Sequence, residues 1–488
     1  MNRPLRRVAV ACLVLFGMLL LQANWVQVVK AKDYRNDPRN RRVLLRTYDR
    51  ERGPIVIGTG KDRQAIAKSV ATTDTLKYLR TYPGGAVYAP VTGFDSLVYS
   101  STGIERQENA ILSGSDDRLL VRRLSDYVTG RQVAGGSIVL TLNQAAQQAA
   151  YNGLQGKVGA VVALDPRTGA VLAEASTPSY DPAVVSTHNP ASIRAAYTKL
   201  IALAGDPLVN RAVERTYPPG STFKVITSAA ALAGGYTPST QIPSPTVLDL
   251  PGTTANLRNF GGEVCGNGKS QTLAEAFRIS CNTAFGALGM ALGADKVRKQ
   301  AQAFGFGDSS LQLPQPVADS VYPDQLTKAQ EAQSAIGQYD VRVTPLQMAM
   351  VAAGIANNGT VMRPYLVREV QAPDLSQLHG ADQMVYAEHA VSAGVAAQLT
   401  TMMESVVQSG TGTAAQISGV RVAGKTGTAQ HAVGQAPHAW FIGFAPAVNP
   451  VVAIAVLVED GGSLGSDATG GKVAAPIARD VMRAVLGR

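Results

Sequence analysis

The hydrophobic pattern of the chain opens with one long apolar run. No charged side chain occurs between Val8 and Val29, and three of the first seven residues are arginine. A run of this length can cross the apolar core of a bilayer as a helix, and the arginines before it predict a cytoplasmic N-terminus. A cleaved signal peptide is the alternative, but the sequence after Ala23 has no clear small-x-small cleavage site. We therefore expect residues 1–30 to be a cytoplasmic tail and an uncleaved single-pass membrane anchor.

Beyond the anchor, apolar residues recur at spacings that predict both strands and helices. The strand patterns lie at residues 138–142, 159–164, 170–175, 420–429, 438–445 and 451–458. The helical patterns lie at residues 143–151, 272–304, 345–355, 395–406 and 476–486. Strands stand at both ends of the region 156–488 and helices lie between them. This order predicts an α+β domain whose two ends meet in one central antiparallel sheet flanked by helices.

Length and composition indicate more than one domain. A chain of 488 residues is too long for one ordinary domain, and 45% hydrophobic with 16% charged residues is typical of a globular protein with a large core. Residues 31–155 contain no catalytic constellation, so we expect a non-catalytic module there. The candidate chemistry lies in residues 156–488, which we expect to be the catalytic domain.

The net charge of +10 predicts an anionic partner, either nucleic acid or a membrane surface. No nucleic-acid-binding motif is found, so the membrane is favoured. The segment between Lys30 and Gly60 is rich in arginine and directly follows the apolar run. We expect it to be a solvated face beside the membrane, with some attraction to anionic lipid.

Cysteine and histidine usage bounds the remaining chemistry. Cys12 lies in the anchor, whereas Cys265 and Cys281 lie in the part expected outside the membrane. These two could form a disulfide bond in an oxidising compartment or remain reduced thiols. The five histidines are scattered, and no histidine or cysteine cluster has the spacing of metal ligands. We expect no metal site and no cofactor.

A candidate nucleophile stands at the start of one predicted helix. The Pro-Pro-Gly turn that follows Tyr217 leads to Ser221, and Lys224 follows three residues later on the same helical face. A serine hydroxyl becomes a good nucleophile when an adjacent base takes its proton, and a buried lysine held neutral can be that base. The N–H groups of the helix N-terminus can stabilise an oxyanion beside Ser221. The alternative is that Ser221 caps a buried helix while Lys224 is solvated.

Two later stretches add to this pair. Ser280 and Asn282 lie between two helical patterns, where a hydroxyl could relay a proton and an amide could bind a substrate amide, although both are also ordinary helix-cap residues. On a predicted strand, Lys425 supplies a positive charge, and the sequence continues with Thr426, Gly427 and Thr428. We expect Gly427 to let a ligand backbone approach the strand, and the Thr428 N–H to be a second oxyanion donor.

The three stretches in this order resemble the active-site motifs of penicillin-binding proteins and class A β-lactamases. Further matches extend over nearly the whole chain. They favour class B penicillin-binding proteins and most closely resemble the type called penicillin-binding protein A in actinobacteria. They are found at residues 36–42, 50–53, 215–220, 336–338, 343–349, 410–414 and 440–443. Cys281 stands where many β-lactamases have aspartate, but that side chain usually points away from the cleft.

The resemblance implies a serine D,D-transpeptidase that cross-links peptidoglycan stem peptides and is acylated by β-lactams. By this resemblance, Ser221 is the residue that is acylated, Lys224 is the base, Ser280 passes the proton on, and Asn282 binds a substrate amide. Lys425, Thr426 and Thr428 bind the terminal carboxylate of the substrate, and the N–H groups of Ser221 and Thr428 form the oxyanion hole. It also implies that residues 31–155 form an elongated pedestal domain for dimerisation or interaction. The catalytic domain would be extracytoplasmic on the cell membrane and would work with proteins of the division or elongation machinery.

Three alternatives remain open from the sequence. A β-lactamase shares the motifs but needs a dedicated base for a deacylating water, and it usually lacks an anchor and a pedestal. A β-lactam sensor needs several membrane spans, whereas the sequence contains one. A catalytically silent scaffold of the division or elongation machinery would keep the pedestal as its functional part.

Overall fold

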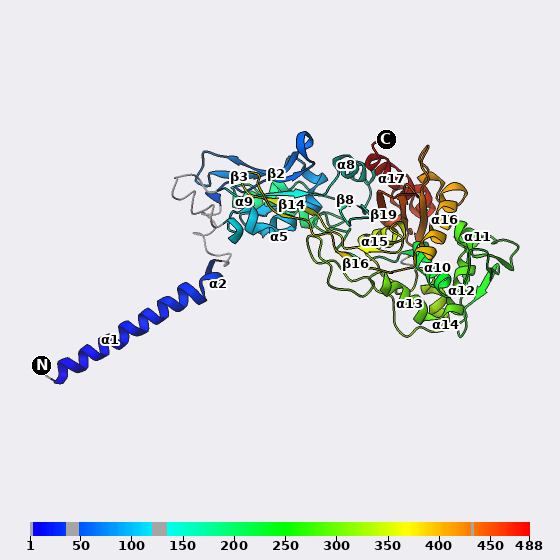
Figure 1. Cartoon of the computed structure of the whole chain (residues 1–488), viewed down its shortest axis with the longest axis horizontal. Coiled ribbons are helices and arrows are strands. Elements are labelled where there is room, and N and C mark those ends of the chain that lie inside the picture. The colour runs from blue at the N-terminus through cyan, green and yellow to red at the C-terminus, as the bar shows by residue number, and fades with distance from the viewer. Residues whose placement is uncertain (1–2, 36–47, 120–133, 431–433) are drawn as a thin grey trace.

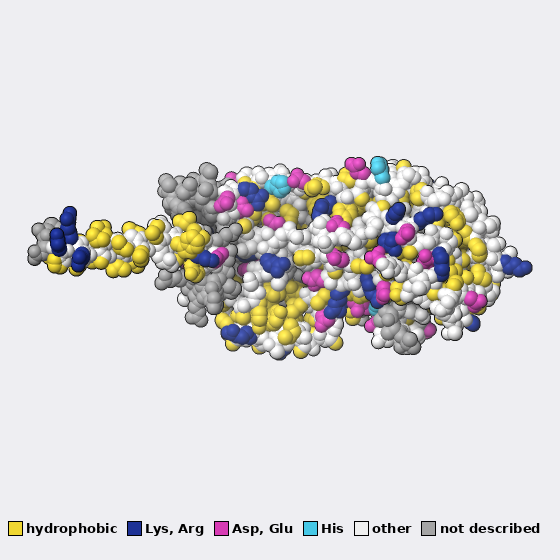
Figure 2. Space-filling model, turned by 90° about the horizontal axis from the view of Figure 1, so that it is seen from below, with side chains coloured by type: hydrophobic (Ala, Val, Ile, Leu, Met, Phe, Trp, Pro, Cys, Tyr) yellow, Lys and Arg dark blue, Asp and Glu magenta, His cyan; other side chains and the backbone are white. Residues whose placement is uncertain are grey.

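The N-terminal helix stands apart from the rest of the molecule (Figure 1). The computed structural model describes residues 3–35, 48–119, 134–430 and 434–488, so residues 36–47 of the arginine-rich segment lie outside it. Helix α1 (Arg3–Asn24) continues through a π-helical turn (Trp25–Val29) into α2 (Ala31–Arg35). Figure 2 shows apolar side chains along α1 and basic ones at its outer end. Within the described ranges, the span Arg3–Val29 is the one helix long and apolar enough to cross a membrane.

A six-stranded sheet forms the core of the domain next to the N-terminal helix. In spatial order its strands are β15 (Gln377–Gly380), β14 (Val367–Gln371), β6 (Ser137–Leu140), β1 (Ile55–Ile57), β2 (Gln64–Ala71) and β3 (Tyr78–Thr81). Strands β1 and β6 are parallel, and the other neighbours are antiparallel. The same domain contains β4 (Asp95–Ser96), β5 (Ser100–Ser101), α4 (Ala89–Thr92), α5 (Gly103–Gln107) and α6 (Asn109–Leu112).

This pedestal is not built from the N-terminal part of the sequence alone. Strands β14 and β15 belong to residues 367–380, which we expected in the second domain, yet they extend the pedestal sheet beyond β6. Helix α9 (Pro190–Ala202) also packs against the pedestal through a cluster that includes Phe94, Val185 and Leu200. Residue 155 therefore does not separate two sheets, because later segments return to complete the first one.

The second sheet is five-stranded and entirely antiparallel, which confirms the predicted central sheet. Its order is β17 (Ala423–Ala429), β18 (His438–Ala445), β19 (Val452–Val458), β7 (Gly159–Leu164) and β8 (Val171–Thr177). Helices α8 (Gln144–Gly153) and α17 (Gly470–Val485) pack on one face, and α15 (Pro345–Ala356) packs on the other. Strand β17 is at one edge, which leaves one row of its backbone groups without a neighbouring strand.

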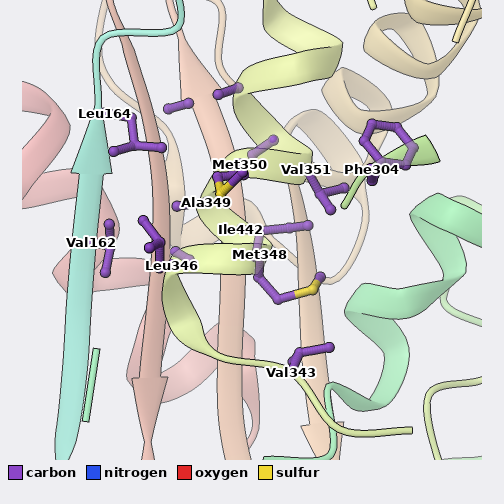
Figure 3. Packing of buried hydrophobic residues seen from close by; sticks show 14 of the residues in the cluster. Val162, Leu164, Phe304, Val343, Leu346, Met348, Ala349, Met350, Val351 and Ile442 are labelled. Carbon is purple, nitrogen blue, oxygen red and sulfur yellow. The ribbon is translucent and has the colours of Figure 1, made fainter. Parts of the chain in front are cut away.

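Helix α15 is the centre of the hydrophobic core, and every one of its residues is buried. Figure 3 shows Leu346 and Met350 of α15 beside Val162 and Leu164 of β7. Such all-round burial requires partners on both sides, which the sheet and the helices near Phe304 provide. The sheet and α15 thus form a rigid support for the elements that carry the candidate chemistry.

A helical region covers the end of this core next to β17. It contains α10 (Lys224–Ala233), α11 (Leu273–Arg278), α12 (Asn282–Leu292), α13 (Ala294–Ala303), α14 (Lys328–Ser334) and α16 (Ala393–Ser409). Three two-strand ladders accompany it: β9 (Gln241–Pro243) with β12 (Ser270–Thr272), β10 (Val247–Asp249) with β11 (Asn256–Arg258), and β13 (Val361–Met362) with β16 (Val385–Ala387). The predicted helix over 272–304 is interrupted at Ser280 and Gly293, both of which have positive φ angles, 65° and 81°.

Glu174 of β8 is a buried carboxyl group where the two domains meet. Asn210 Nδ2 donates hydrogen bonds to Glu174 Oε1 (2.6 Å) and to the Pro90 carbonyl of the pedestal (3.2 Å). Glu174 Oε2 is buried and has no hydrogen-bond partner among the described atoms. Burial, with a smaller contribution from the charge of Glu214, raises the pKa of Glu174 to about 8, against the hydrogen bond from Asn210.

This raised pKa makes stability depend on pH. Between the ordinary pKa of 4.5 and about 8 the folded chain binds a proton that the unfolded chain does not, so stability falls as pH rises through this window. Glu174→Gln mimics the neutral acid and should stabilise the protein by roughly 2–3 kcal/mol at pH 7 but have little effect at pH 4.5. Urea unfolding of Glu174→Gln at the two pH values, with the exposed Glu388→Gln as control, measures this difference. An equal effect of Glu174→Gln at both pH values would contradict it.

Candidate active site

The turn that carries Ser221 is fixed from several directions. Ser221 lies in a 3₁₀ turn (Gly220–Phe223) that leads directly into α10. The Gly220 N–H donates to the Gly337 carbonyl (2.9 Å), and Gly220 has a φ of 54°, a conformation that glycine adopts without strain. Trp440 Nε1 donates to the Pro218 carbonyl (3.0 Å), which ties the turn to β18. The nucleophile candidate is therefore held between the central sheet and the segment that precedes α15.

Lys224 is fully buried, and its amine faces the second motif. Nζ donates to the Ser280 carbonyl (2.7 Å) and to Asn282 Oδ1 (2.7 Å), and it lies 3.3 Å from Ser280 Oγ. Both of these oxygens can only accept hydrogen bonds. A neutral Lys224 amine has two N–H groups, and it would donate one to each oxygen. The lone pair of a neutral Lys224 then remains for a hydroxyl group.

Lys425 approaches the same serine from β17. Its Nζ donates to Ser280 Oγ (2.8 Å) and to the Thr426 carbonyl (3.0 Å). The hydroxyl of Ser280 therefore lies between two amines that are 201 residues apart in sequence. Ser280 has an unfavourable left-handed backbone conformation, with a φ of 65°, which places both its carbonyl and its side chain toward Lys224. The predicted convergence of the three motifs is present in the structure.

The pKa values of the two lysines are both lowered, but the causes differ. Burial, followed by the charge of Lys425, lowers the pKa of Lys224 well below its usual value. Burial lowers the pKa of Lys425 to about 7. Both amines therefore lose a proton more readily than an ordinary lysine, and at Lys224 the positive charge of Lys425 adds to the effect of burial.

A cleft of about 620 Å³ opens above these groups. Ser221, Asn282 and Thr428 lie together on its wall. Ser221 Oγ makes no hydrogen bond to Lys224 within the described part of the chain, so the nucleophile and its candidate base are adjacent but not bonded. Such contacts are often long without substrate. The other described lining residues are Asn256, Leu257, Arg258, Asn259, Phe260, Gly261, Gln333, Ile336, Gln338, Tyr339, Gln430, Gln435, Pro437 and Ser466.

The structure gives a different reason for Gly427 from the one expected. A Cβ atom there would lie 2.9 Å from Thr222 Cγ2 and 3.0 Å from both the Pro219 carbonyl and Trp440 Cβ. The space is therefore occupied by the Ser221 turn and β18, and the packing of these elements itself requires a glycine at position 427. Thr428, on the same edge strand, lies beside Gly220.

Two residues without a predicted role also shape the site. Asn259 Oδ1 accepts the backbone N–H groups of Asn282 (2.8 Å) and Thr283 (3.0 Å) and so caps α12 from a distant loop. The hydroxyls of Thr411 and Thr426 are hydrogen-bonded to each other. Thr411 lies in residues 410–414, which resemble the family, and this resemblance could have pointed to a role for it in the site. Nothing local in the sequence identifies Asn259.

A disulfide bond joins Cys265 to Cys281 in the structure. Cys281 is the middle residue of the second motif, and its side chain is buried away from the cleft-lining atoms. The bond attaches the loop that contains Asn259 to the start of α12. Both connections restrict movement of Ser280 and Asn282.

This geometry can perform acyl transfer through serine. A neutral amine can take the proton of Ser221, a hydroxyl can pass protons between two amines, and the edge of β17 with the helix start offers N–H groups to an oxyanion. The fold and the site together define the class of enzymes that act through an acylated serine.

Comparisons with known proteins place the chain within this class. Residues 159–483 match the penicillin-binding protein transpeptidase domain, and residues 52–138 match the penicillin-binding protein A dimerisation domain. The chain is 50% identical over 494 residues to the peptidoglycan D,D-transpeptidase PbpA of Mycolicibacterium smegmatis, covering 100% of this chain and 99% of the relative. The chain belongs to the penicillin-binding proteins that carry a transpeptidase domain.

Solved structures agree with this assignment. Penicillin-binding protein A of Mycobacterium tuberculosis, as a ceftriaxone acyl-enzyme complex, superposes with a TM-score of 0.87 at 47% identity and covers 91% of this chain and 100% of that chain. The transpeptidase domain of a peptidoglycan glycosyltransferase from Eggerthella lenta has a TM-score of 0.77 at 34% identity, covering 90% of this chain and 98% of that one. The predicted fold class and family are confirmed.

Proposed function

We propose that the chain is a peptidoglycan D,D-transpeptidase that forms an acyl-enzyme on Ser221 and is a target of β-lactams. The observation that carries this proposal is the position of Ser280 Oγ, 3.3 Å from Lys224 Nζ and 2.8 Å from Lys425 Nζ. A β-lactam or a stem peptide ending in D-Ala–D-Ala supplies the carbonyl carbon that Ser221 attacks. The relatives named as D,D-transpeptidases and the solved acyl-enzyme complex support the same reaction.

In the first half-reaction Lys224 takes the proton of Ser221 as Oγ bonds to the carbonyl carbon of the penultimate residue. The N–H groups of Ser221 and Thr428 stabilise the resulting oxyanion. The C–N bond to the terminal D-alanine then breaks, and the proton passes from Lys224 through Ser280 to the leaving amine. The products are an ester on Ser221 and free D-alanine.

In the second half-reaction an amine from a neighbouring stem attacks the ester carbonyl. Lys224 takes the proton of that amine, and Ser221 Oγ leaves and regains a proton, so the cross-link forms and the enzyme is restored. During the first half-reaction Asn282 holds the substrate amide, while Lys425, Thr426 and Thr428 bind the terminal carboxylate of the donor, which then leaves with the D-alanine. The charge on Lys425 is compatible with a carboxylate ligand, which favours the protonated form of the amine.

A β-lactamase is the second candidate, and the lining of the cleft argues against it. None of the described lining residues is a carboxylate or a histidine, so these residues supply no base for a hydrolytic water. The acyl-enzyme formed with a β-lactam should therefore persist.

Mass spectrometry after incubation with benzylpenicillin tests the proposed function. We expect one stoichiometric adduct on the peptide containing Ser221 and none in Ser221→Ala, because no other described hydroxyl combines this turn with a neutral amine. The adduct should outlast the labelling experiment. An adduct on another residue, or rapid release of hydrolysed penicillin, would contradict the transpeptidase assignment.

We also propose that α1 anchors the chain in the cell membrane and that the rest of the chain lies outside the cytoplasm. Residues 31–155, completed by β14 and β15, would form the pedestal, and the remainder of residues 156–488 would form the transpeptidase domain. The pedestal would contact proteins of the division or elongation machinery. A photo-cross-linker at Val70, which is 44% exposed, should give a discrete cross-linked species in the membrane fraction of intact cells. Recovery of the chain in the soluble fraction would contradict the anchor, and recovery from membranes without a cross-link would contradict the partner.

A further inference from the structure

The cleft above Ser221 contains one charged side chain among its described lining residues, that of Arg258. Lys224 and Lys425 lie beneath the cleft and are fully buried. Arg258 is exposed, and in the part of the chain that the structure describes its guanidinium makes one hydrogen bond, from Nε to Asn256 Oδ1 at 3.3 Å. Arg258 thus lines a site that the reaction requires to bind a peptide, and its guanidinium has further N–H donors for a ligand.

The direction of β17 shows which part of a donor peptide would meet Arg258. This step rests on the proposed function, in which the terminal carboxylate binds at Lys425 and Thr426. Ser221 then acts on the next residue, and the rest of the donor continues past Asn282 and Thr428. The cleft extends in that direction, since Arg258 and Gln430 line it whereas Thr426 does not.

Arg258 is placed there by a fixed segment of backbone. Asn282 Nδ2 donates to the Arg258 carbonyl (3.2 Å), so the residue that would hold the substrate amide is bonded to the residue that carries the cation. The next residue, Asn259, accepts both N–H groups at the start of α12, and the disulfide at Cys281 secures the same loop. The backbone that carries Arg258 is therefore held beside Asn282, the residue proposed to bind the substrate amide.

We propose that Arg258 is a specificity-determining residue that binds a free carboxylate on the donor, upstream of the D-Ala–D-Ala dipeptide. The ligand class is a stem peptide, or a β-lactam, whose acyl side carries a carboxylate. A planar guanidinium pairs with a carboxylate through two parallel hydrogen bonds, and an amide in the same place cannot repeat that pairing. Amidation of the stem would therefore weaken recognition at this subsite.

Two penicillins provide a matched test. Carbenicillin differs from benzylpenicillin by one carboxylate on the acyl side chain, so the ratio of their second-order acylation rate constants isolates the effect of that charge. In Arg258→Gln the ratio of the carbenicillin to the benzylpenicillin rate constant should fall roughly three- to tenfold, because a charge-assisted hydrogen bond is lost. In Arg258→Lys the ratio should fall less, because the positive charge remains. Arg194→Gln, an exposed arginine outside the cleft, removes the same net charge and should leave the ratio unchanged.

The outcomes separate this proposal from the proposed function. Labelling of Ser221 by benzylpenicillin at an unchanged rate in Arg258→Gln shows that the acylation machinery is intact. An unchanged ratio in that variant would overturn the subsite, and so would an equal loss for both penicillins, which would indicate a structural role. Failure of both penicillins to label the unsubstituted chain would instead overturn the proposed function.

Peptide donors extend the test to the substrate itself. In acetyl-X-D-Ala-D-Ala peptides, X would carry a side-chain carboxylate on two to four methylenes or the matching carboxamide. For at least one length, kcat/KM for release of D-alanine should favour the carboxylate roughly three- to tenfold, and Arg258→Gln should remove the preference. Equal kcat/KM for carboxylate and carboxamide at every length would overturn the proposal.

Discussion

Replacing Lys224 with alanine should slow acylation of Ser221 by benzylpenicillin roughly a thousandfold, because it removes the group placed to take the proton of the serine. Lys224→Arg should be similarly slow, since a guanidinium stays protonated and cannot act as a base. Stopped-flow or quench labelling measures the rate. Lys296→Ala, which removes an exposed lysine, should acylate at the unchanged rate. Rapid labelling of a folded Lys224→Ala at neutral pH would remove Lys224 from the role of base.

The pH profile supplies a second readout of the same role. Acylation needs the neutral amine, so its rate should fall at acid pH as Lys224 becomes protonated. The charge of Lys425 is one cause of the lowered pKa of Lys224. Lys425→Ala removes that charge, raises the pKa of Lys224 and should move the acid limb of the profile to higher pH. A limb that stayed in place or moved to lower pH would show that the two amines are not coupled as their contacts with Ser280 indicate.

The sequence predicted those parts of the fold that local patterns encode. The apolar run, the strand alternation at both ends of the second domain and the spacing of Ser221 and Lys224 each depend on neighbouring residues, and the structure contains the corresponding elements. The start of the last helix was less predictable. Pro476 suggested a beginning there, because proline suits the first turn, but α17 begins at Gly470 and contains the proline. A Cβ at Gly470 would lie 2.0 Å from the Trp440 carbonyl, so packing against β18 determines that end.

Contacts between distant segments were not encoded in any local pattern. Residues 367–380 have ordinary strand character, but nothing in their sequence indicates that they pair with β6 in the other domain. The same limit applies to the site. Ser, Lys and Thr could be assigned roles by resemblance, whereas the place of Arg258 in the cleft follows from a hydrogen bond between β11 and α12. The reason for Gly427 was also beyond a local reading, because it depends on a turn about 200 residues earlier.

The pedestal has its own buried charge network, centred on Glu105. Arg52 Nε lies 2.6 Å from Glu105 Oε2, and Arg80 Nε lies 2.7 Å from Glu105 Oε1. Tyr82 donates its hydroxyl hydrogen to Oε1 at 3.2 Å, so the carboxylate is bonded on both oxygens. Burial alone would raise the pKa of Glu105, but the charges and hydrogen bonds of Arg80 and Arg52 hold it below its usual value. The network joins β3, α5 and the segment before β1.

Glu105→Ala should therefore destabilise the pedestal by about 3–5 kcal/mol, because it leaves two buried guanidinium groups without their shared carboxylate. Hydrogen exchange of the full-length protein in detergent should show faster exchange in peptides of β1, β2 and β3. Exchange in α15 and labelling of Ser221 by benzylpenicillin should change far less, since among the described residues the hydrogen bonds and ion pairs of this network involve neither the central sheet nor α10. Glu275→Ala, which breaks a partly exposed pair with Arg278, is the matched control and should cost about 1 kcal/mol or less. Equal stability of the two variants would mean that the buried arginines find other partners. Loss of Ser221 labelling in parallel with pedestal opening would instead mean that the returning strands β14 and β15 make the two domains unfold as one unit.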